Sequence, residues 1–339
     1  SEFMHAFLDP AILFFVFGVL AASVKSNLEI PPAISRFLSL YLLMALGLKG
    51  GFALAHSGFT PEVATSLVSA IVLAVLIPLI GFAVLKHCLS GFDAAAVAAT
   101  YGSVSAVTFV TAVQYLDNNG IAFGGHMAAA MALMESPAII LAVIFANSIR
   151  QQRSAHSAIN IHNGVAVLGI GSSNSNHSLK KILHESFTDG AQLLLLGAML
   201  VGFISGEAGQ SAMQPFSADL FKGMLAFFLL DMGLMTARSL HQLKGISVGL
   251  IVYALFAPVL HAAMALLIAL MTQASRGDAI LLMVLAASAS YIAVPAVLRT
   301  AIPEAKPSLY FGMSLGITFP LNLLIGIPSY TWVSGQFFS

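Results

Sequence analysis

Two short segments place small polar residues where their backbone could bind ions. The first is Thr100-Tyr-Gly-Ser-Val-Ser105 and the second is Ala286-Ala-Ser-Ala-Ser290, each about ten residues after a leading aspartate, Asp93 or Asp278. Gly and Ser hold a helix closed poorly, so we expect each helix to be interrupted there. An opened helix directs free N–H groups at an anion, while its unwound carbonyls coordinate a cation. The pair therefore predicts one site for a small anion and Na⁺.

The predicted anion contacts are drawn from both segments. They are Gly102, Ser103, Val104, Ser105, Ser288, Ala289, Ser290 and Tyr291. The alternative interpretation is that small Ser and Ala residues only let helices pack closely. The recurrence of the pattern at matched depth favours the interrupted helices.

Oxygen-bearing side chains in or beside the apolar stretches are the predicted Na⁺ ligands. They are Thr100, Thr108, Glu135, Asp93, Asp278, Thr318 and Asn322. Glu135 is close to Pro137, which breaks a helix beside a carboxylate that can hold Na⁺ or a proton. Glu135 is alternatively paired with Lys49 or neutral, and Asp93 and Asp278 are alternatively ordinary first-turn caps. We expect Pro320 to break a second helix beside Thr318 and Asn322.

Other common site types lack their signatures in this sequence. The ten His form no H-x-x-x-H or H-E-x-x-H pattern, and we interpret His126 and His261 as packing or interface residues. The single Cys88 excludes an internal disulfide framework and a cysteine metal site. The glycine-containing segment 168–173 lacks the Gly-Lys-Ser/Thr ending of a phosphate loop. We therefore expect no enzyme and no cofactor, with Na⁺ as a coupling ion.

The elements that must position these residues are membrane spans. The chain has 339 residues, of which 58% are hydrophobic and 8% charged, whereas soluble domains carry about 25% charged residues. A formal net charge of zero argues against a nucleic-acid partner and leaves membrane lipid as the surroundings. The sequence therefore predicts an all-α membrane protein.

We count ten spans of about 20 or more apolar residues. They cover 9–25, 33–56, 63–87, 93–116, 122–149, 189–209, 216–238, 246–272, 277–299 and 308–333. One long polar stretch divides them, which predicts a first five-helix repeat at 4–150, a loop at 151–187 and a second repeat at 188–339. Because five is odd, the second repeat enters the membrane from the opposite side.

Lys and Arg residues predict the orientation, since positively charged loops stay in the cytoplasm. With the N-terminus outside, only Lys222 and Arg276 lie outside and Lys49 lies within a span, while the other eleven lie inside. We therefore expect a multi-pass protein of the inner (plasma) membrane, with both termini outside and the central loop cytoplasmic.

The two halves share anchors at nearly one spacing. Asp93, Ser103 and Ser105 recur 185 positions later as Asp278, Ser288 and Ser290. Two further anchors are Gly47 with Gly233, 186 positions apart, and Pro137 with Pro320, 183 apart. Matching spans of opposite orientation predict two inverted repeats, with broken, crossing helices in spans 4 and 9 and the site at their interface near the bilayer midplane.

Five stretches carry a resemblance to a known family. They are Gly102-Ser-Val-Ser105, Met134-Glu-Ser-Pro-Ala138 with Val143-Ile-Phe-Ala-Asn147, Ala287-Ser-Ala-Ser-Tyr-Ile-Ala-Val-Pro295, and Gly316-Ile-Thr-Phe-Pro-Leu-Asn-Leu-Leu-Ile-Gly-Ile-Pro328. The chain resembles the sodium-dependent bicarbonate transporter family of cyanobacteria and other bacteria across essentially all ten spans.

The resemblance implies a Na⁺/HCO₃⁻ symporter with core and gate domains, a homotrimeric assembly and a small PII-like regulator at the cytoplasmic face. Two positions depart from the family pattern, since Ala106 replaces a second Gly and Glu135 replaces Asp. These departures leave open a Na⁺- or H⁺-coupled carrier of another small anion on the same fold. A membrane sensor or intramembrane enzyme needs a nucleophile with a base or an attached signalling domain, and the sequence shows neither.

Overall fold

The computed structural model describes residues 2–159, 179–185 and 188–338, and every regular element in these ranges is a helix. The all-α prediction is confirmed. The first half contains α1 (Glu2–Phe7), α2 (Pro10–Ser23), α3 (Pro32–Ser57), α4 (Pro61–Leu85), α5 (Gly91–Gly102), α6 (Ala106–Asn118), α7 (Met127–Glu135) and α8 (Pro137–Ile159). The second contains α10 (Gly190–Gln214), α11 (Phe221–Ser239), α12 (Val248–Met271), α13 (Arg276–Ala287), α14 (Ala293–Ala301), α15 (Phe319–Leu321) and α16 (Ile327–Phe337).

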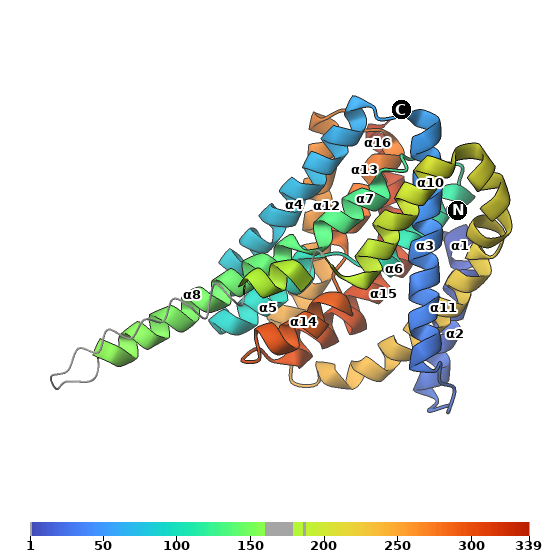
Figure 1. The fold of residues 1–339 in the computed structure, drawn as a ribbon. Helices are drawn as coiled ribbons and strands as arrows, with labels where there is room; N and C mark the ends of the chain where they lie inside the picture. Colours follow the sequence, from blue (N-terminus) through green and yellow to red (C-terminus); the bar gives the residue numbers. More distant parts are fainter. Residues whose placement is uncertain (1, 160–178, 186–187, 339) are drawn as a thin grey trace.

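The predicted loop 151–187 is partly helical where it is described. The helix α8 continues to Ile159 and extends away from the helical body, and residues 179–185 form a further short helix (Figure 1). The segment 168–173 lies outside the described residues.

Seven helical segments of the described chain are long and apolar enough to cross a membrane. Three of the ten predicted spans are not separate members of this set. The stretch 9–25 contains only the 14-residue α2, and 277–299 is divided between α13 and α14. The stretch 216–238 is joined to 189–209 in one helical segment that kinks at Gly206. Ten spans therefore remain a prediction.

The helices form two groups that pack mainly within themselves. In the smaller group α3 lies along α10 and α2 lies along α11. Glycines allow these pairs to approach closely, because a Cβ at Gly47 would lie 2.5 Å from the Leu195 carbonyl oxygen and one at Gly233 would lie 2.2 Å from that of Phe15. We call α2, α3, α10 and α11 the four-helix group, and the helices α4–α8 and α12–α16 the larger group.

Both serine segments interrupt their helices, as the sequence predicts. The helix α5 ends at Gly102 and α6 begins at Ala106. The helix α13 ends at Ala287 and α14 begins at Ala293. Small residues make these openings possible, and buried neighbours supply partners for the freed backbone groups, as lipid cannot.

The interrupted helices α5 and α13 begin with the same cap. The hydroxyl oxygens of Ser90 and Ser275 accept hydrogen bonds from the N–H groups of Asp93 and Asp278. Each aspartate then accepts a bond from a distant loop, Asp93 from the Lys306 N–H at 2.8 Å and Asp278 from the Gly124 N–H at 2.7 Å. The two carboxylates therefore fix the loops that lead into the last helices of each half.

The expected helix break at Pro320 is wrong. The chain stays helical from Ser308 to Phe337, and π-helical turns at Ser314–Thr318 and Asn322–Gly326 flank Pro320. A π-turn changes the hydrogen-bond register, so it accommodates a residue that has no N–H without opening the helix.

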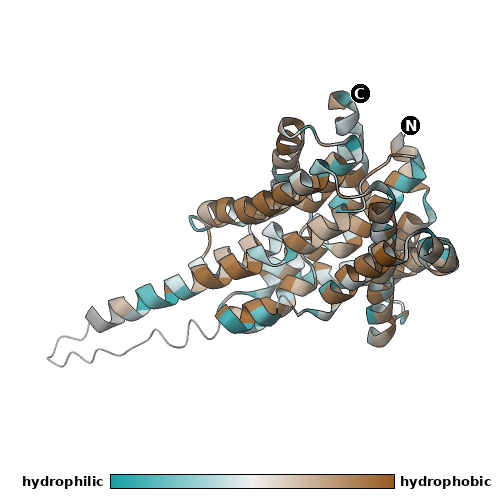
Figure 2. Ribbon diagram, turned by 45° about the horizontal axis from the view of Figure 1, so that its top comes forward, coloured by the Kyte–Doolittle hydropathy of each residue, from teal (hydrophilic) through white to brown (hydrophobic). Residues whose placement is uncertain are grey.

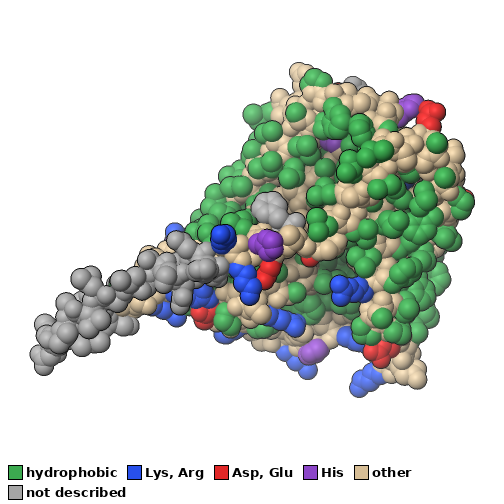
Figure 3. All heavy atoms as spheres, viewed as in Figure 1, with side chains coloured by type: hydrophobic (Ala, Val, Ile, Leu, Met, Phe, Trp, Pro, Cys, Tyr) green, Lys and Arg blue, Asp and Glu red, His purple; other side chains and the backbone are tan. Residues whose placement is uncertain are grey.

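The surface is apolar over the sides of the helical body and charged towards one end. Figure 2 shows hydrophobic residues along most of the body and hydrophilic residues on the outlying part of α8. Figure 3 shows a broad hydrophobic area, with Lys and Arg gathered along the lower part of this face. This distribution is typical of a protein that is surrounded by lipid.

Candidate functional site

The two helix interruptions meet and hydrogen-bond to each other. The Ser290 N–H donates to the Thr100 carbonyl oxygen at 2.9 Å, and the Ser105 N–H donates to the Ser288 hydroxyl oxygen at 3.2 Å. Both bonds lie in the interior, since Ser105, Ser288 and Ser290 are buried. Each interrupted helix thus provides hydrogen-bond partners for some of the free backbone groups of the other.

Uncharged oxygen atoms gather at this crossing. The Thr108 hydroxyl lies 3.1 Å from the Ser105 hydroxyl and 3.4 Å from that of Tyr291, which also faces the Asn322 side chain. The Asn322 amide nitrogen donates to the Ala287 carbonyl oxygen at 2.9 Å, so its orientation is fixed. Its carbonyl oxygen Oδ1 is buried and has no hydrogen-bond partner within 3.5 Å among the described residues. We call these four side chains the oxygen cluster.

A cavity of about 260 Å³ adjoins the crossing. Its walls include Ser105, Ala106 and Val107 at the start of α6, and Ile292 and Ala293 at the start of α14. First-turn N–H groups have no partner within their own helix. Two half-helices therefore bring their positive ends to one hollow, which favours an anion.

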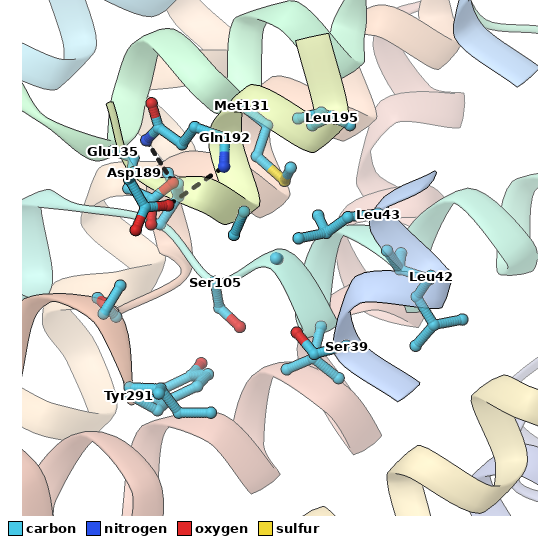
Figure 4. A pocket seen from close by; sticks show the side chains of 18 of the residues that line it. Ser39, Leu42, Leu43, Ser105, Met131, Glu135, Asp189, Gln192, Leu195 and Tyr291 are labelled. Atoms are coloured by element: carbon cyan, nitrogen blue, oxygen red, sulfur yellow. Dashed lines mark hydrogen bonds between the residues drawn. The ribbon is translucent and has the colours of Figure 1, made fainter. Parts of the chain in front are cut away.

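The mouth of this cavity carries acidic and amide groups. Glu135 at the end of α7 accepts a hydrogen bond from Gln192 of α10 at 2.6 Å, and Asp189 caps the start of α10 beside it (Figure 4). The residues that line the cavity in the described chain include no Lys or Arg. A bound anion therefore obtains no compensating charge from a basic side chain here.

Comparison with known families decides the class of this protein. Residues 10–335 match the family described as the Na⁺-dependent bicarbonate transporter superfamily. The chain belongs to this superfamily. No curated protein matches the chain. Superfamily membership and the apolar helices make it a multi-pass membrane transporter of Na⁺ and bicarbonate type, and place it among transporters and not among enzymes.

Several predicted site residues of the transporter lie at the crossing or the cavity. Val104, Ser105, Ser290, Tyr291 and Glu135 line the cavity. Thr100, Ser288, Thr108 and Asn322 form the crossing and the oxygen cluster just described. Ala289 is buried between the two serines.

Other predicted residues have structural partners instead. Gly102 packs so tightly on Pro78 that a Cβ would approach it to 2.8 Å, and the Ser103 hydroxyl donates to the Glu135 carbonyl oxygen. The Thr318 hydroxyl lies between the Tyr101 hydroxyl and the Ala254 carbonyl oxygen, at 2.7 and 2.8 Å.

Asp93 and Asp278 also have structural partners. Each carboxylate accepts a hydrogen bond from a loop N–H group, and neither residue lines the cavity. The structure thus brings the two halves of the predicted anion set together, but spreads the predicted Na⁺ set over five places.

The alternative pairing of Glu135 with Lys49 is wrong. Lys49 forms an ion pair with Asp117 at 3.0 Å on the other side of the crossing from the cavity mouth. Glu135 is held by Gln192, as described above. His126 lies at an interface between helices, because its ring is 3.2 Å from the Asp278 carboxylate at the start of α13.

Sequence reasoning missed three polar residues that line the cavity: Ser39, Asp189 and Gln192. They come from α3 and from the start of α10, which belong to the four-helix group. An Asp followed by an apolar run is an ordinary helix start, so nothing in the local pattern separates Asp189 from other caps. Only the packing of α10 beside α7 brings it to the mouth.

Proposed function

We propose that the protein is a secondary active symporter that imports bicarbonate together with Na⁺ by alternating access. The observation that carries the proposal is the cavity at the first turns of both α6 and α14, next to a cluster of uncharged oxygens. An anion and a cation can bind side by side in such a place.

The anion is held by backbone in this proposal. Ser105 and Ser290 cap the two half-helices, because their hydroxyl oxygens accept bonds from the N–H groups of Thr108 and Val294. These bonds leave the first-turn N–H groups of Ala106, Val107, Ile292 and Ala293 for the bicarbonate oxygens. The proposed anion contacts are therefore the two serine turns, with Tyr291 beside them.

Na⁺ is bound by the oxygen cluster in this proposal, with Asn322 Oδ1 as its leading ligand. A hard cation prefers oxygen ligands, and a buried unpartnered carbonyl oxygen gains most from one. The hydroxyls of Ser105, Thr108 and Tyr291 complete the set. Thr100 contributes to the crossing through its carbonyl, whereas Thr318, Asp93 and Asp278 support the fold.

Electrostatics favours coupling of the two ions. The cavity mouth has two acidic residues and no basic one, so a lone anion is repelled while a Na⁺ next to it is attracted. Import of an anion into a cell that is negative inside also costs about 2.3 kcal/mol per 100 mV. One co-transported Na⁺ cancels this cost and leaves its concentration gradient as the driving force.

The architecture that we propose is ten helices in two inverted five-helix repeats at 4–150 and 188–339. It is supported by reciprocal contacts: α2 packs on α11 as α10 packs on α3, and α4 packs on α5 as α12 packs on α13. Asp93 and Asp278 bind loops at Lys306 and Gly124, which are 182 positions apart. The Lys and Arg distribution supports outside termini and a cytoplasmic central loop; the homotrimer and the PII-like regulator stay predictions of the resemblance.

Uptake into proteoliposomes tests the function. We expect labelled bicarbonate to accumulate only under an inward Na⁺ gradient, and accumulation to disappear in Ser105→Ala or Ser290→Ala. Thr300→Ala, an exposed position at the far end of α14, is the matched control and keeps uptake within twofold. Equal uptake with K⁺ in place of Na⁺ would rule out the proposal.

A second candidate is a carrier of another small anion, coupled to Na⁺ or to H⁺. Two observations favour this candidate. The Ala106 side chain takes up space in the cavity at the first turn of α6 that a Gly would leave free, and Glu135 places a carboxyl group at the cavity mouth. Competition of labelled bicarbonate uptake by nitrate, formate or sulfite, and its dependence on a pH gradient without Na⁺, separate the two candidates.

A further inference from the structure

The two helix groups are also joined on the far side of the crossing from the cavity. Lys49 of α3 pairs with Asp117 near the end of α6 at 3.0 Å, and its ammonium lies 4.9 Å from the Phe221 ring centroid. The next residue, Asn118, donates to the Asp9 carboxylate that caps α2, at 3.1 Å. The end of α6 is therefore tied to both α2 and α3.

Hollows lie at both ends of the contact between α3 and α6. The cavity uses Leu42 and Leu43 of α3 with Val107 and Val110 of α6. A second hollow of about 260 Å³ is lined one turn further along by residues that include Leu46, Lys49, Val113 and Asp117. The same two helices thus separate the cavity from the second hollow.

Lys49 also borders a wider vestibule. This space of about 860 Å³ is lined by Lys49 and residues that include His56, Glu207, Gln210 and Gln214. Lys49 is the one Lys or Arg among the described residues that line either the second hollow or the vestibule. Among the described lining residues, an anion in the vestibule therefore finds this ammonium group as its one Lys or Arg partner.

The two ends of the contact differ in how they are closed. At the cavity mouth the groups are joined by the hydrogen bond between Glu135 and Gln192, and the space beside it is open. At the far end an ion pair and a second polar contact hold α6 between α2 and α3. The cavity and the second hollow have the same volume of about 260 Å³, so the two ends differ in what joins the helix groups: one hydrogen bond on the Glu135 side, and an ion pair with a second polar contact on the Lys49 side.

We propose that Lys49 and Asp117 form the outer gate of the transporter, and that a small inorganic anion opens it by replacing Asp117 as the partner of Lys49. The inference rests on the proposed alternating access between two sides of the membrane. The gate adds a first anion contact, about a turn and a half of α3 away from the cavity wall. It also explains why a basic side chain, Lys49, lies at this position and none lines the cavity in the described chain.

Thiol labelling tests the gate without transport. Val113→Cys, in a Cys88→Ser background, places a thiol at a buried position of α6 that borders the second hollow. The protein is reconstituted in nanodiscs, where reagents reach both faces, and labelled with a charged methanethiosulfonate. We expect Lys49→Gln and Asp117→Asn each to raise the labelling rate about fivefold or more. The exchanged pair, Lys49→Asp with Asp117→Lys, should return it to within twofold of the parent.

A matched ion pair provides the control. Arg150 and Glu304 also lie 2.8 Å apart, but both belong to the larger group, so Glu304→Gln should leave the labelling rate of the Val113→Cys thiol unchanged. Unchanged labelling in Lys49→Gln and Asp117→Asn, or no recovery in the exchanged pair, would overturn the gate.

Anion dependence tests the second part of the proposal. Bicarbonate should speed labelling of the parent about threefold over gluconate at equal ionic strength, and should have no such effect in Lys49→Gln. Equal effects of both salts, or the same acceleration in Lys49→Gln, would overturn the role of the anion. Because no uptake is measured, this failure is distinct from a failure of Na⁺-driven bicarbonate import.

Discussion

The two helix interruptions share a backbone geometry but differ in the side chain that the last helices of each half bring to them. Beside the first, Glu135 has its carbonyl bonded to Ser103 and its carboxylate at the cavity mouth. When Pro137 is aligned with Pro320, Thr318 takes the position that corresponds to Glu135. Thr318 is fully buried between Tyr101 and Ala254. Asn322 follows one turn later and reaches the crossing. The first half thus provides a carboxyl group at the cavity mouth, and the second half provides a neutral, enclosed side chain.

The difference shows how two similar halves can divide the work of binding an ion pair. A neutral amide oxygen inside the protein binds Na⁺ without adding a buried charge, whereas a carboxylate is cheaper where water reaches it. We therefore expect changes on the enclosed side to abolish binding and changes at the mouth to modify it.

Loss of the amide oxygen should have the largest effect. Asn322→Leu should lower Na⁺-dependent bicarbonate uptake at least 20-fold, because it removes the buried oxygen that faces the crossing. Thr331→Val on α16 is the control, since its hydroxyl only bonds to its own helix at Ile327. Initial uptake rates at saturating Na⁺ check the prediction, and a rate within twofold of the parent in Asn322→Leu would contradict the assignment.

Substitution at the cavity mouth should have a weaker effect on uptake than loss of the Asn322 amide. Glu135→Gln keeps an amide within reach of Gln192 but removes the charge, so we expect the Na⁺ concentration for half-maximal uptake to rise about fivefold with little loss of maximal rate. Thr318→Val should lower thermal stability without this shift, because its hydroxyl only joins α5 to α12. Identical Na⁺ titrations for Glu135→Gln and the parent would show that the carboxylate has no part in binding.

The close packing of Gly47 and Gly233 provides a test of whether the two halves are structurally equivalent. Gly47→Val and Gly233→Val each force a side chain against a backbone carbonyl, so each should lower the free energy of unfolding by about 1–3 kcal/mol. Gly197→Val on α10 meets open space and is the control. Unfolding curves of the purified variants check this, and a large effect at only one of the two positions would break the symmetry that we propose.

The smallest expected effect concerns the loop that leads into the last helices. The Arg150 guanidinium lowers the pKa of Glu304, which lies in the turn after α14. A lowered pKa means that the stabilisation is present above the unfolded value of about 4.3 and is lost as pH falls through the folded value. Since both side chains are partly exposed, Glu304→Gln should cost at most about 0.5 kcal/mol at pH 7, and the difference should shrink as the pH falls through the folded pKa.

The sequence predicts the fold class and both helix interruptions because their signals are local. Apolar length marks the spans, and small polar residues mark the openings around Ser103 and Ser288. The number of spans is harder to predict, since α2 is short and the kink at Gly206 leaves α10 and α11 in one helical segment. The π-turns around Pro320 are also invisible to a rule that treats proline as a helix break.

Site residues that depend on tertiary packing could not be predicted in the same way. Lys49 and Asp117 are 68 positions apart, and neither has a neighbour that marks it as part of a pair. His126 and Asp278 meet only because the loop before α7 lies on the start of α13. Spacing predicted the two helix interruptions, but only the folded chain separates residues at the crossing, such as Asn322, from residues that hold a loop, such as Asp93.

The most direct test of a shared anion and Na⁺ site is thermal unfolding in the presence of each ion alone and of both ions together. A ligand that binds only the native state raises the stability of that state. Bicarbonate should raise the unfolding temperature in NaCl but not in choline chloride at equal ionic strength, and this Na⁺-dependent increase should vanish in Ser290→Ala. An equal increase in both salts, or an unchanged increase in Ser290→Ala, would contradict a shared anion and Na⁺ site at the crossing of the two half-helices.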